Sequence, residues 1–152
     1  REGVVFDAWA RLQNRRDPGL VTRLCAALDQ LEAARHWALL PFFLLSAAET
    51  LDRHGEAATA AGLLGRAADV AEATGERWCE PEILRLRARH AGGGSAALGL
   101  LRQSLARARE QGALLWERRA AADLARLLRR QGQCEAARGV VASIRARTSR
   151  GL

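Results

Sequence analysis

Glycine recurs at a nearly constant interval through the last two-thirds of this 152-residue chain. Successive members of the series are separated by 20, 19, 18, 20 and 19 residues. Glycine is the residue best able to adopt the left-handed backbone conformation that ends an α-helix. Stops at this interval predict helices of about 12 to 16 residues joined by tight turns. The series comprises Gly55, Gly75, Gly94, Gly112, Gly132 and Gly151.

Apolar residues between these stops recur with the 3.6-residue period of an α-helix and do not alternate as in a β-strand. Tyrosine is absent and β-branched residues are few, which further disfavours a sheet. We therefore expect an all-α fold. The stripes are Val5, Trp9 and Leu12; Val21, Leu24, Leu28 and Leu31; Leu40, Leu44, Ala47 and Leu51; Leu64, Ala67 and Ala71; Ala97, Leu101, Leu105 and Ala108; Trp116, Ala120, Leu124 and Leu127; and Ala137, Val140, Val141 and Ile144.

Pairing these helices in order predicts a single helical-repeat domain over residues 1–152. It would contain four hairpins, at about 4–34, 41–73, 82–110 and 116–147. Short connections between consecutive helices favour antiparallel neighbours.

The amino-acid sequence also repeats from hairpin to hairpin. The segment Ala60–Leu64 resembles Ala97–Leu101, which lies 37 residues later, and Glu135–Val141 continues the pattern after another 40 residues. A period of this length with two helices is typical of a solenoid, in which each hairpin buries its apolar stripe against the next. The expected fold class is a tetratricopeptide-like right-handed helical solenoid, and a closed helical bundle is the alternative.

Individual residues mark the expected helix starts. Pro18, Pro41 and Pro81 lie near three of them, where the missing backbone N–H of proline costs little. Ser95 follows three glycines and is expected to be the N-cap of its helix.

Residues that would indicate catalysis or metal binding are not arranged in a recognisable pattern. Lysine is absent, which excludes a phosphate-binding loop of the lysine type, and the glycines at 92–94 neither follow a strand nor have GxGxxG spacing. None of His36, His54 and His90 has another His or Cys three or four residues away. No catalytic residue, cofactor or metal is therefore predicted. A small helical metal protein or enzyme, for example with Cys79 beside His90, is the second alternative.

Other features bear on the cellular setting. Cys25, Cys79 and Cys134 are far apart and are expected to be small buried hydrophobic residues in a reducing compartment. No apolar run approaches the roughly 20 residues that span a bilayer, and the first residues do not form a signal peptide. We therefore expect a cytoplasmic location and no membrane partner. Methionine is absent even at position 1, so we expect the chain to be a segment of a longer polypeptide.

Positive charge is concentrated in the second half of the chain. All 24 basic residues are arginines. Residues 76–152 hold 16 of them against 7 acidic residues, a net charge of +9, whereas residues 1–75 hold 8 against 10, a net charge of −2. A basic half can attract acidic protein, membrane or nucleic acid.

Six arginines of this half are the candidate partner-binding residues. Arg85 and Arg89 are one helical turn apart, as are Arg126 and Arg130, so each pair shares a helix face. They would form a basic patch if the first helices of the hairpins line a concave surface. The alternative is a solvated helix face in a genome that favours arginine codons. The six are Arg85, Arg89, Arg118, Arg119, Arg126 and Arg130.

The acidic residues of this half are expected at the surface. Glu82 with Arg85, and Asp123 with Arg126 or Arg119, have the helical spacing of surface ion pairs. No pair of acidic residues is predicted to share an apolar pocket.

Several motifs occur in a fixed order and carry a resemblance to a known family. The chain is similar to the C-terminal tetratricopeptide-like region of bacterial multidomain signal-transduction ATPases. In that family the helical region follows a nucleotide-binding module, often fused to an adenylate cyclase or to a DNA-binding transcriptional-regulator domain. The motifs are Thr74–Arg77, Glu82–Leu86, Ala108–Ala113, Glu117–Leu127 and Gly132–Arg138.

The resemblance implies a non-catalytic protein-interaction or sensor domain that regulates the ATPase or transcription factor to which it belongs. A protein, or another domain of the same polypeptide, is the expected partner. The first alternative is a helical repeat that binds nucleic acid through the arginine-rich half. The oligomeric state is not predicted.

Overall fold

A computed structural model describes residues 2–35 and 37–150, and all regular structure among them is α-helical. The all-α class expected from the periodicity is therefore confirmed. The helices are α1 (Glu2–Leu12), α2 (Pro18–Ala33), α3 (Leu40–Arg53), α4 (Ala57–Thr74), α5 (Glu80–His90), α6 (Ser95–Glu110), α7 (Leu114–Arg130) and α8 (Cys134–Arg150).

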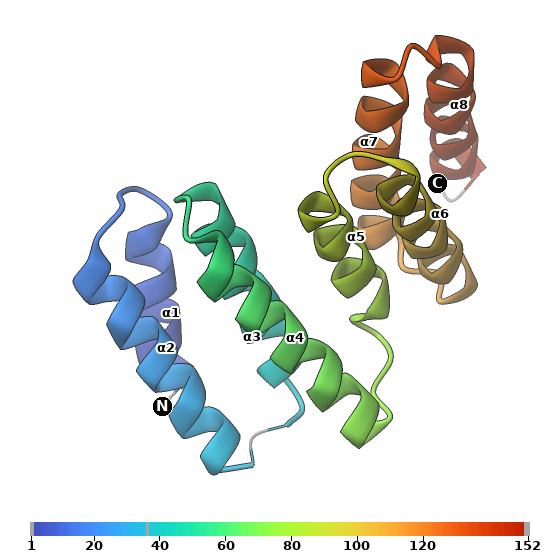
Figure 1. Cartoon of the computed structure of the whole chain (residues 1–152). Helices are drawn as coiled ribbons and strands as arrows, with labels where there is room; N and C mark the ends of the chain where they lie inside the picture. Colours follow the sequence, from blue (N-terminus) through green and yellow to red (C-terminus); the bar gives the residue numbers. More distant parts are fainter. Residues whose placement is uncertain (1, 36, 151–152) are drawn as a thin grey trace. The chain divides into compact units, whose positions relative to one another are not determined.

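The chain divides into two compact units, Arg1–Cys79 with helices α1 to α4 and Glu80–Leu152 with helices α5 to α8. Within each unit, consecutive helices form antiparallel hairpins, α1 with α2, α3 with α4, α5 with α6 and α7 with α8 (Figure 1). The first helices of the two hairpins also contact each other in each unit, α1 with α3 and α5 with α7. The second helix of the first hairpin contributes as well, because α2 contacts α3 and α6 contacts α7, so in both units the first helix of the second hairpin packs against both helices of the first.

Several side-chain contacts between hairpins join residues that are 37 to 40 positions apart, which is the period of the sequence repeat, and others have separations of 34 or 42 residues. In the first unit Arg16 donates to Glu56, 40 residues away, over 2.7 Å. In the second unit Arg85 donates to Asp123, 38 residues away, over 2.6 Å. Residues one period apart thus lie side by side on neighbouring hairpins. Further examples are Trp9 with Ser46, Gln13 with Arg53, and Glu82 with Arg119.

Glycine ends the helices at four of the predicted stops. Gly55, Gly75, Gly112 and Gly132 have φ angles of 81°, 71°, 65° and 76°, in the left-handed region. These four predictions are confirmed. Gly151 lies outside the described residues.

The stop predicted at Gly94 is wrong. Gly92 and Gly93 have φ angles of 72° and 80°, whereas Gly94 has a φ of −87° and is the N-cap of α6. Ser95 is consequently the first helical residue and not the N-cap, and no side chain caps this helix start. The chain turns at the first two of three consecutive glycines, which leaves the third to begin the next helix.

The helix starts predicted near the three prolines are confirmed. Pro18 is the first residue of α2, and Pro41 and Pro81 are the second residues of α3 and α5. The Asp17 carboxylate caps α2 by accepting hydrogen bonds from the backbone N–H groups of Gly19 and Leu20. This cap was not predicted from the sequence.

The apolar stripes form the cores of the two units, because most of their members are buried. In the second unit the core includes Ala97, Leu101 and Leu105 of α6 and Ala120 and Leu124 of α7. Burial of such faces is the main source of stability for short helices.

Three residues that the sequence predicts to be buried, Trp116, Cys25 and Cys134, are more exposed than predicted. Trp116 was expected in the core but is only half-buried, with the Arg119 guanidinium 5.7 Å from its ring centroid. Cys79 is buried as expected, whereas Cys25 is half-buried and Cys134, the first residue of α8, is exposed.

Candidate functional site

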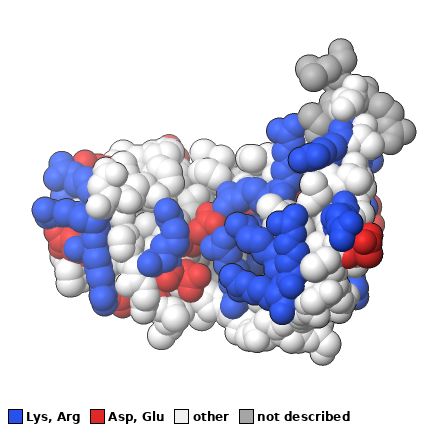
Figure 2. Space-filling view, turned by 90° about the horizontal axis from the view of Figure 1, so that it is seen from above, with Lys and Arg blue, Asp and Glu red and all other residues white. Residues whose placement is uncertain are grey.

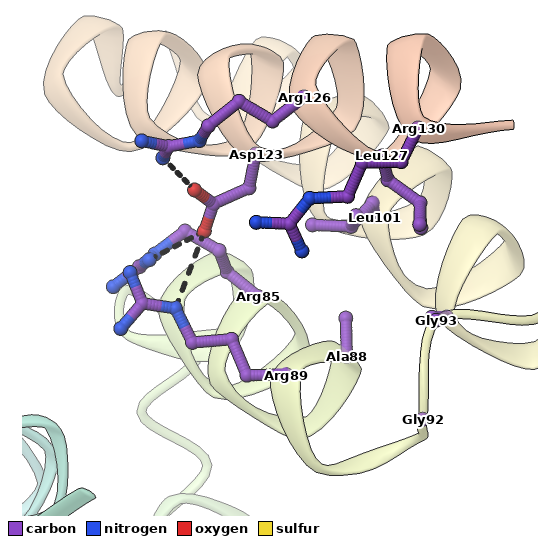
Figure 3. A pocket seen from close by; sticks show the side chains of 11 residues that line it. Arg85, Ala88, Arg89, Gly92, Gly93, Leu101, Asp123, Arg126, Leu127 and Arg130 are labelled. Carbon is purple, nitrogen blue, oxygen red and sulfur yellow. Dashed lines mark hydrogen bonds and ion pairs between the residues drawn. The ribbon is translucent and has the colours of Figure 1, made fainter. Parts of the chain in front are cut away.

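A cavity of about 530 Å³ lies in the second unit among α5, α6, α7 and the loop of three glycines, residues 92–94, that joins α5 to α6 (Figure 3). Its charged wall consists of arginines from α5 and α7 and one aspartate from α7. Its other wall consists of small or apolar residues. The charged residues are Arg85, Arg89, Asp123, Arg126 and Arg130, and the uncharged ones are Ala88, Gly92, Gly93, Ala97, Leu101 and Leu127.

Helical spacing brings the charged side chains together. Arg85 and Arg89 are separated by four residues on α5, and Asp123, Arg126 and Arg130 recur at three and four residues on α7, so each set shares one helix face. Because α5 and α7 contact each other, the two faces meet. The cavity therefore lies at the point where the two hairpins of this unit join.

Arg85 is the centre of a buried ionic network. Its Nε and Nη2 donate to the two carboxylate oxygens of Glu82 over 2.8 and 2.7 Å, and its Nη1 donates to Asp123 Oδ2 over 2.6 Å. Arg119 Nη2 lies 3.1 Å from Glu82 Oε1. Arg85 and Glu82 are only 2% and 3% exposed. The prediction that Glu82 and Arg85 form a surface pair is therefore wrong, since α7 packs over them.

Three arginine side chains form ion pairs with the Asp123 carboxylate. Its Oδ2 is bound by Arg85 and lies 3.6 Å from Arg89 Nε, and its Oδ1 accepts a hydrogen bond from Arg126. Burial alone would raise the pKa of Asp123, but the hydrogen bonds from Arg85 and Arg126 and the positive charges of Arg85 and Arg89 outweigh it. The pKa of Asp123 therefore lies below its ordinary value, and the carboxylate is ionised at neutral pH.

Arg130 completes the charged wall. Its guanidinium points into the space between α5 and α7 (Figure 3). Within residues 2–35 and 37–150, no acidic side chain forms an ion pair with it. The cavity lining holds four arginines and one acid, Asp123, and Glu82 lies outside the lining and pairs with Arg85. Figure 2 shows arginine side chains gathered on one face of the second unit.

Four of the six candidate arginines line this cavity: Arg85, Arg89, Arg126 and Arg130. Arg119 is not among the lining residues and forms an ion pair with Glu82. Arg118 is exposed and is not part of the cavity wall.

Sequence reasoning missed the roles of Glu82 and Asp123 as the acids that organise the arginines. The separation of Arg85 and Asp123 is 38 residues, and that of Glu82 and Arg119 is 37 residues, which is the repeat period. Oppositely charged residues one period apart were therefore a usable signal for a contact between hairpins.

Other polar features of the described residues lie outside this cavity, among them Glu117, which is 1% exposed and pairs with Arg109 and Arg147. His54 Nε2 lies 2.6 Å from the carbonyl oxygen of Leu12 and ties α3 to α1. No three His, Cys, Asp or Glu side chains of the described chain are grouped so that they could hold a metal ion. His36 lies outside the described residues. No helix in the described ranges is both long enough and apolar enough to cross a bilayer.

Comparison with known proteins found no match: no family model, no curated protein and no solved structure is similar to this chain. The function of the cavity must therefore be argued from its own geometry and charge.

Proposed function

We propose that this chain is a non-catalytic, tetratricopeptide-like binding domain that regulates a bacterial signalling ATPase or transcriptional regulator through contact with a protein or with another domain of the same polypeptide. Two kinds of observation support this proposal. One is the repetition of hairpin contacts, and the other is the arginine-lined cavity.

The hairpin contacts support a repeat architecture. The same separations, 37 to 40 residues, join neighbouring hairpins in both units. Stacked helix pairs of this kind present extended surfaces and are widely used to hold partners. A right-handed solenoid of four hairpins is the arrangement that we propose for the whole chain.

The arginine-lined cavity is the observation that carries the proposal. Folding has gathered three arginines around Asp123 and a fourth, Arg130, in the same cavity lining, and like charges in one cavity repel one another. Guanidinium groups recognise carboxylate and phosphate through pairs of parallel hydrogen bonds. An anionic group of a partner would offset the repulsion and bind Arg130, with which no acidic side chain of the described residues forms an ion pair.

The test is affinity capture by the immobilised chain from an extract of its source cells. The wild type is compared with the Arg126→Glu/Arg130→Glu variant and with Arg129→Glu, since Arg129 is an exposed neighbour on α7 outside the cavity wall. We expect a protein that the wild type and Arg129→Glu retain and the double variant loses. Retention by all three, or no retained protein, would refute the proposal.

A second candidate function is nucleic-acid binding, which the net charge of +9 over residues 76–152 favours. Fluorescence anisotropy with single- and double-stranded oligonucleotides at two salt concentrations tests it. Binding through several phosphates would fall steeply as the salt concentration rises. Absence of binding at the lower salt concentration would remove this candidate.

A further inference from the structure

The arginine-lined cavity has the size of a small-molecule site. Its volume of about 530 Å³ falls within the roughly 300 to 1,000 Å³ that is typical of pockets for small organic ligands. An acidic side chain or an inorganic anion would occupy only part of it.

The cavity lining combines charged and uncharged residues. The four arginines come from α5 and α7, and beside them the lining includes Ala88 of α5, Leu127 of α7 and Leu101 of α6 (Figure 3). A ligand that fits both kinds of residue has an anionic group and an uncharged portion.

Asp123 shows that the arginines can converge on a single anionic group. Its carboxylate is reached by Arg85 and Arg89 from α5 and by Arg126 from its own helix. Arg130 is one turn further along α7 and has no acidic partner in the part of the chain that the structure describes. The cavity therefore has room for a second anionic group beside Asp123, with Arg130 as its principal donor and Arg126 adjacent.

The net charge of the cavity wall indicates which class of anionic group would bind there. Asp123 in the lining and Glu82, which binds Arg85 from outside it, neutralise two of the four arginine charges and leave +2. A monoanionic carboxylate would leave +1, whereas a phosphate monoester carries a charge of about −1.5 to −2 at pH 7 and offers three acceptor oxygens. The phosphate thus matches the number of donors and the charge more closely.

The first turn of α6 adds to this preference. Ala97, in that turn, lines the cavity, and no side chain caps the helix start at Gly94. The positive end of a helix dipole favours a phosphate group over a neutral one. Gln131 holds the loop in place, because its Nε2 donates to the carbonyl oxygen of Gly93 over 2.9 Å.

From these observations we propose that the cavity binds the phosphate monoester group of a small organic molecule, with Arg126 and Arg130 on the phosphate and the Ala88–Leu101–Leu127 wall on the organic portion. This inference rests on the proposed binding function and names the class of ligand that would control it.

The experiment is calorimetric titration of the full chain with phenyl phosphate, beside benzoate, inorganic phosphate and phenol as matched probes. We expect saturable one-to-one binding of phenyl phosphate and affinities about tenfold or more weaker for each of the other three. Phenol and benzoate lose charge-assisted hydrogen bonds, and inorganic phosphate loses the burial of the apolar ring. Methyl resonances of Ala88, Leu101 and Leu127 should shift on binding, and those of Leu24 in the first unit should not.

Two arginine variants test whether Arg130 binds the phosphate group. Arg130→Gln should weaken phenyl phosphate binding about tenfold or more, and Arg129→Gln by less than about twofold, because an exposed arginine outside the cavity acts only through a screened charge. Both side chains are exposed, so both variants should keep the circular dichroism spectrum of the wild type. Equal loss in the two variants would overturn the assignment.

The remaining outcomes separate this inference from the proposed function. Equal affinity for benzoate would overturn the preference for a phosphate, and equal affinity for inorganic phosphate would overturn the organic portion of the ligand. Binding of an oligoglutamate peptide but not of phenyl phosphate, lost in Arg130→Gln, would overturn the inference and leave the partner-binding function intact. Loss of protein capture by the Arg126→Glu/Arg130→Glu variant does not depend on phenyl phosphate and tests the function alone.

Discussion

Replacing Arg85 by methionine tests the buried ionic network. The substitution keeps a long unbranched side chain but removes the guanidinium that bridges Glu82 and Asp123. Glu82, which is 3% exposed, would then keep one arginine neighbour, Arg119 at 3.1 Å. Asp123 would keep Arg126 and Arg89. We expect a large loss of stability, because a buried carboxylate would lose its main partner.

The size of the loss follows from the contacts. Arg85 donates hydrogen bonds of 2.8 and 2.7 Å to Glu82 and of 2.6 Å to Asp123, from a side chain that is 2% exposed. Removing one partner of a buried ion pair typically costs about 3 to 5 kcal/mol. The arginines that stay beside the two acids reduce this, so we expect a decrease of about 3 kcal/mol in the free energy of unfolding.

The assay is urea unfolding followed by circular dichroism at 222 nm, with the free energy extrapolated to zero urea. The matched control is Arg138→Met, which breaks an exposed pair with Glu135 whose side chains are 69% and 86% accessible. Such a pair contributes little, and its loss should cost less than about 0.5 kcal/mol.

A second substitution separates the charge from the packing. Adding Glu82→Gln to Arg85→Met removes the carboxylate that has lost its partner, so the double variant should recover about 1 kcal/mol. A loss below about 1 kcal/mol for Arg85→Met would contradict the argument that unpaired buried charge dominates. No recovery in the double variant would contradict it as well.

Two further predictions concern the same unit. Asp123→Asn should lower the free energy of unfolding at pH 7, because folding lowers the pKa of Asp123 and so stabilises its ionised carboxylate. The difference in stability between the wild type and the variant should persist at pH values above the unfolded-state pKa of about 3.9. It should shrink as the pH falls through the lowered pKa of the folded state. Urea titrations at pH 7, 5, 4 and 3 measure this, and a difference that grows toward acid pH would contradict it. Gly132→Ala should destabilise the chain by about 1 kcal/mol, because the φ angle of Gly132 is +76°. Gly139→Ala should stabilise it by about 0.5 to 1 kcal/mol, because Gly139 lies inside α8 and an added Cβ would meet no neighbouring side chain within 4 Å. Thermal unfolding compares the two, and destabilisation by both would refute the distinction.

The number of helices and their approximate ends could be predicted because both depend on local chemistry. A glycine that adopts positive φ ends a helix wherever it stands, and Gly55, Gly75, Gly112 and Gly132 do so as expected. The periodic apolar residues likewise showed which helix faces would be buried. At the three consecutive glycines this local rule could not choose among equal candidates, and Gly94 was assigned wrongly.

The arginine face of each helix was also predictable, because spacings of three and four residues put side chains on one side of a helix regardless of its surroundings. That reasoning found Arg85 with Arg89 and Arg126 with Arg130. It could not show that the two faces meet, which follows only from the contact between α5 and α7.

Burial of charge was decided by the tertiary structure alone. The spacing of Glu82 and Arg85 shows that they share a helix face, but it does not show whether that face is buried or exposed to water. Only the packing of α7 against α5 removes it from solvent and adds Asp123 from 38 residues away. The local sequence thus determined helices and their faces, whereas the cavity and its net positive charge arise from two faces meeting, because burial and long-range electrostatics depend on neighbours that the local pattern does not contain.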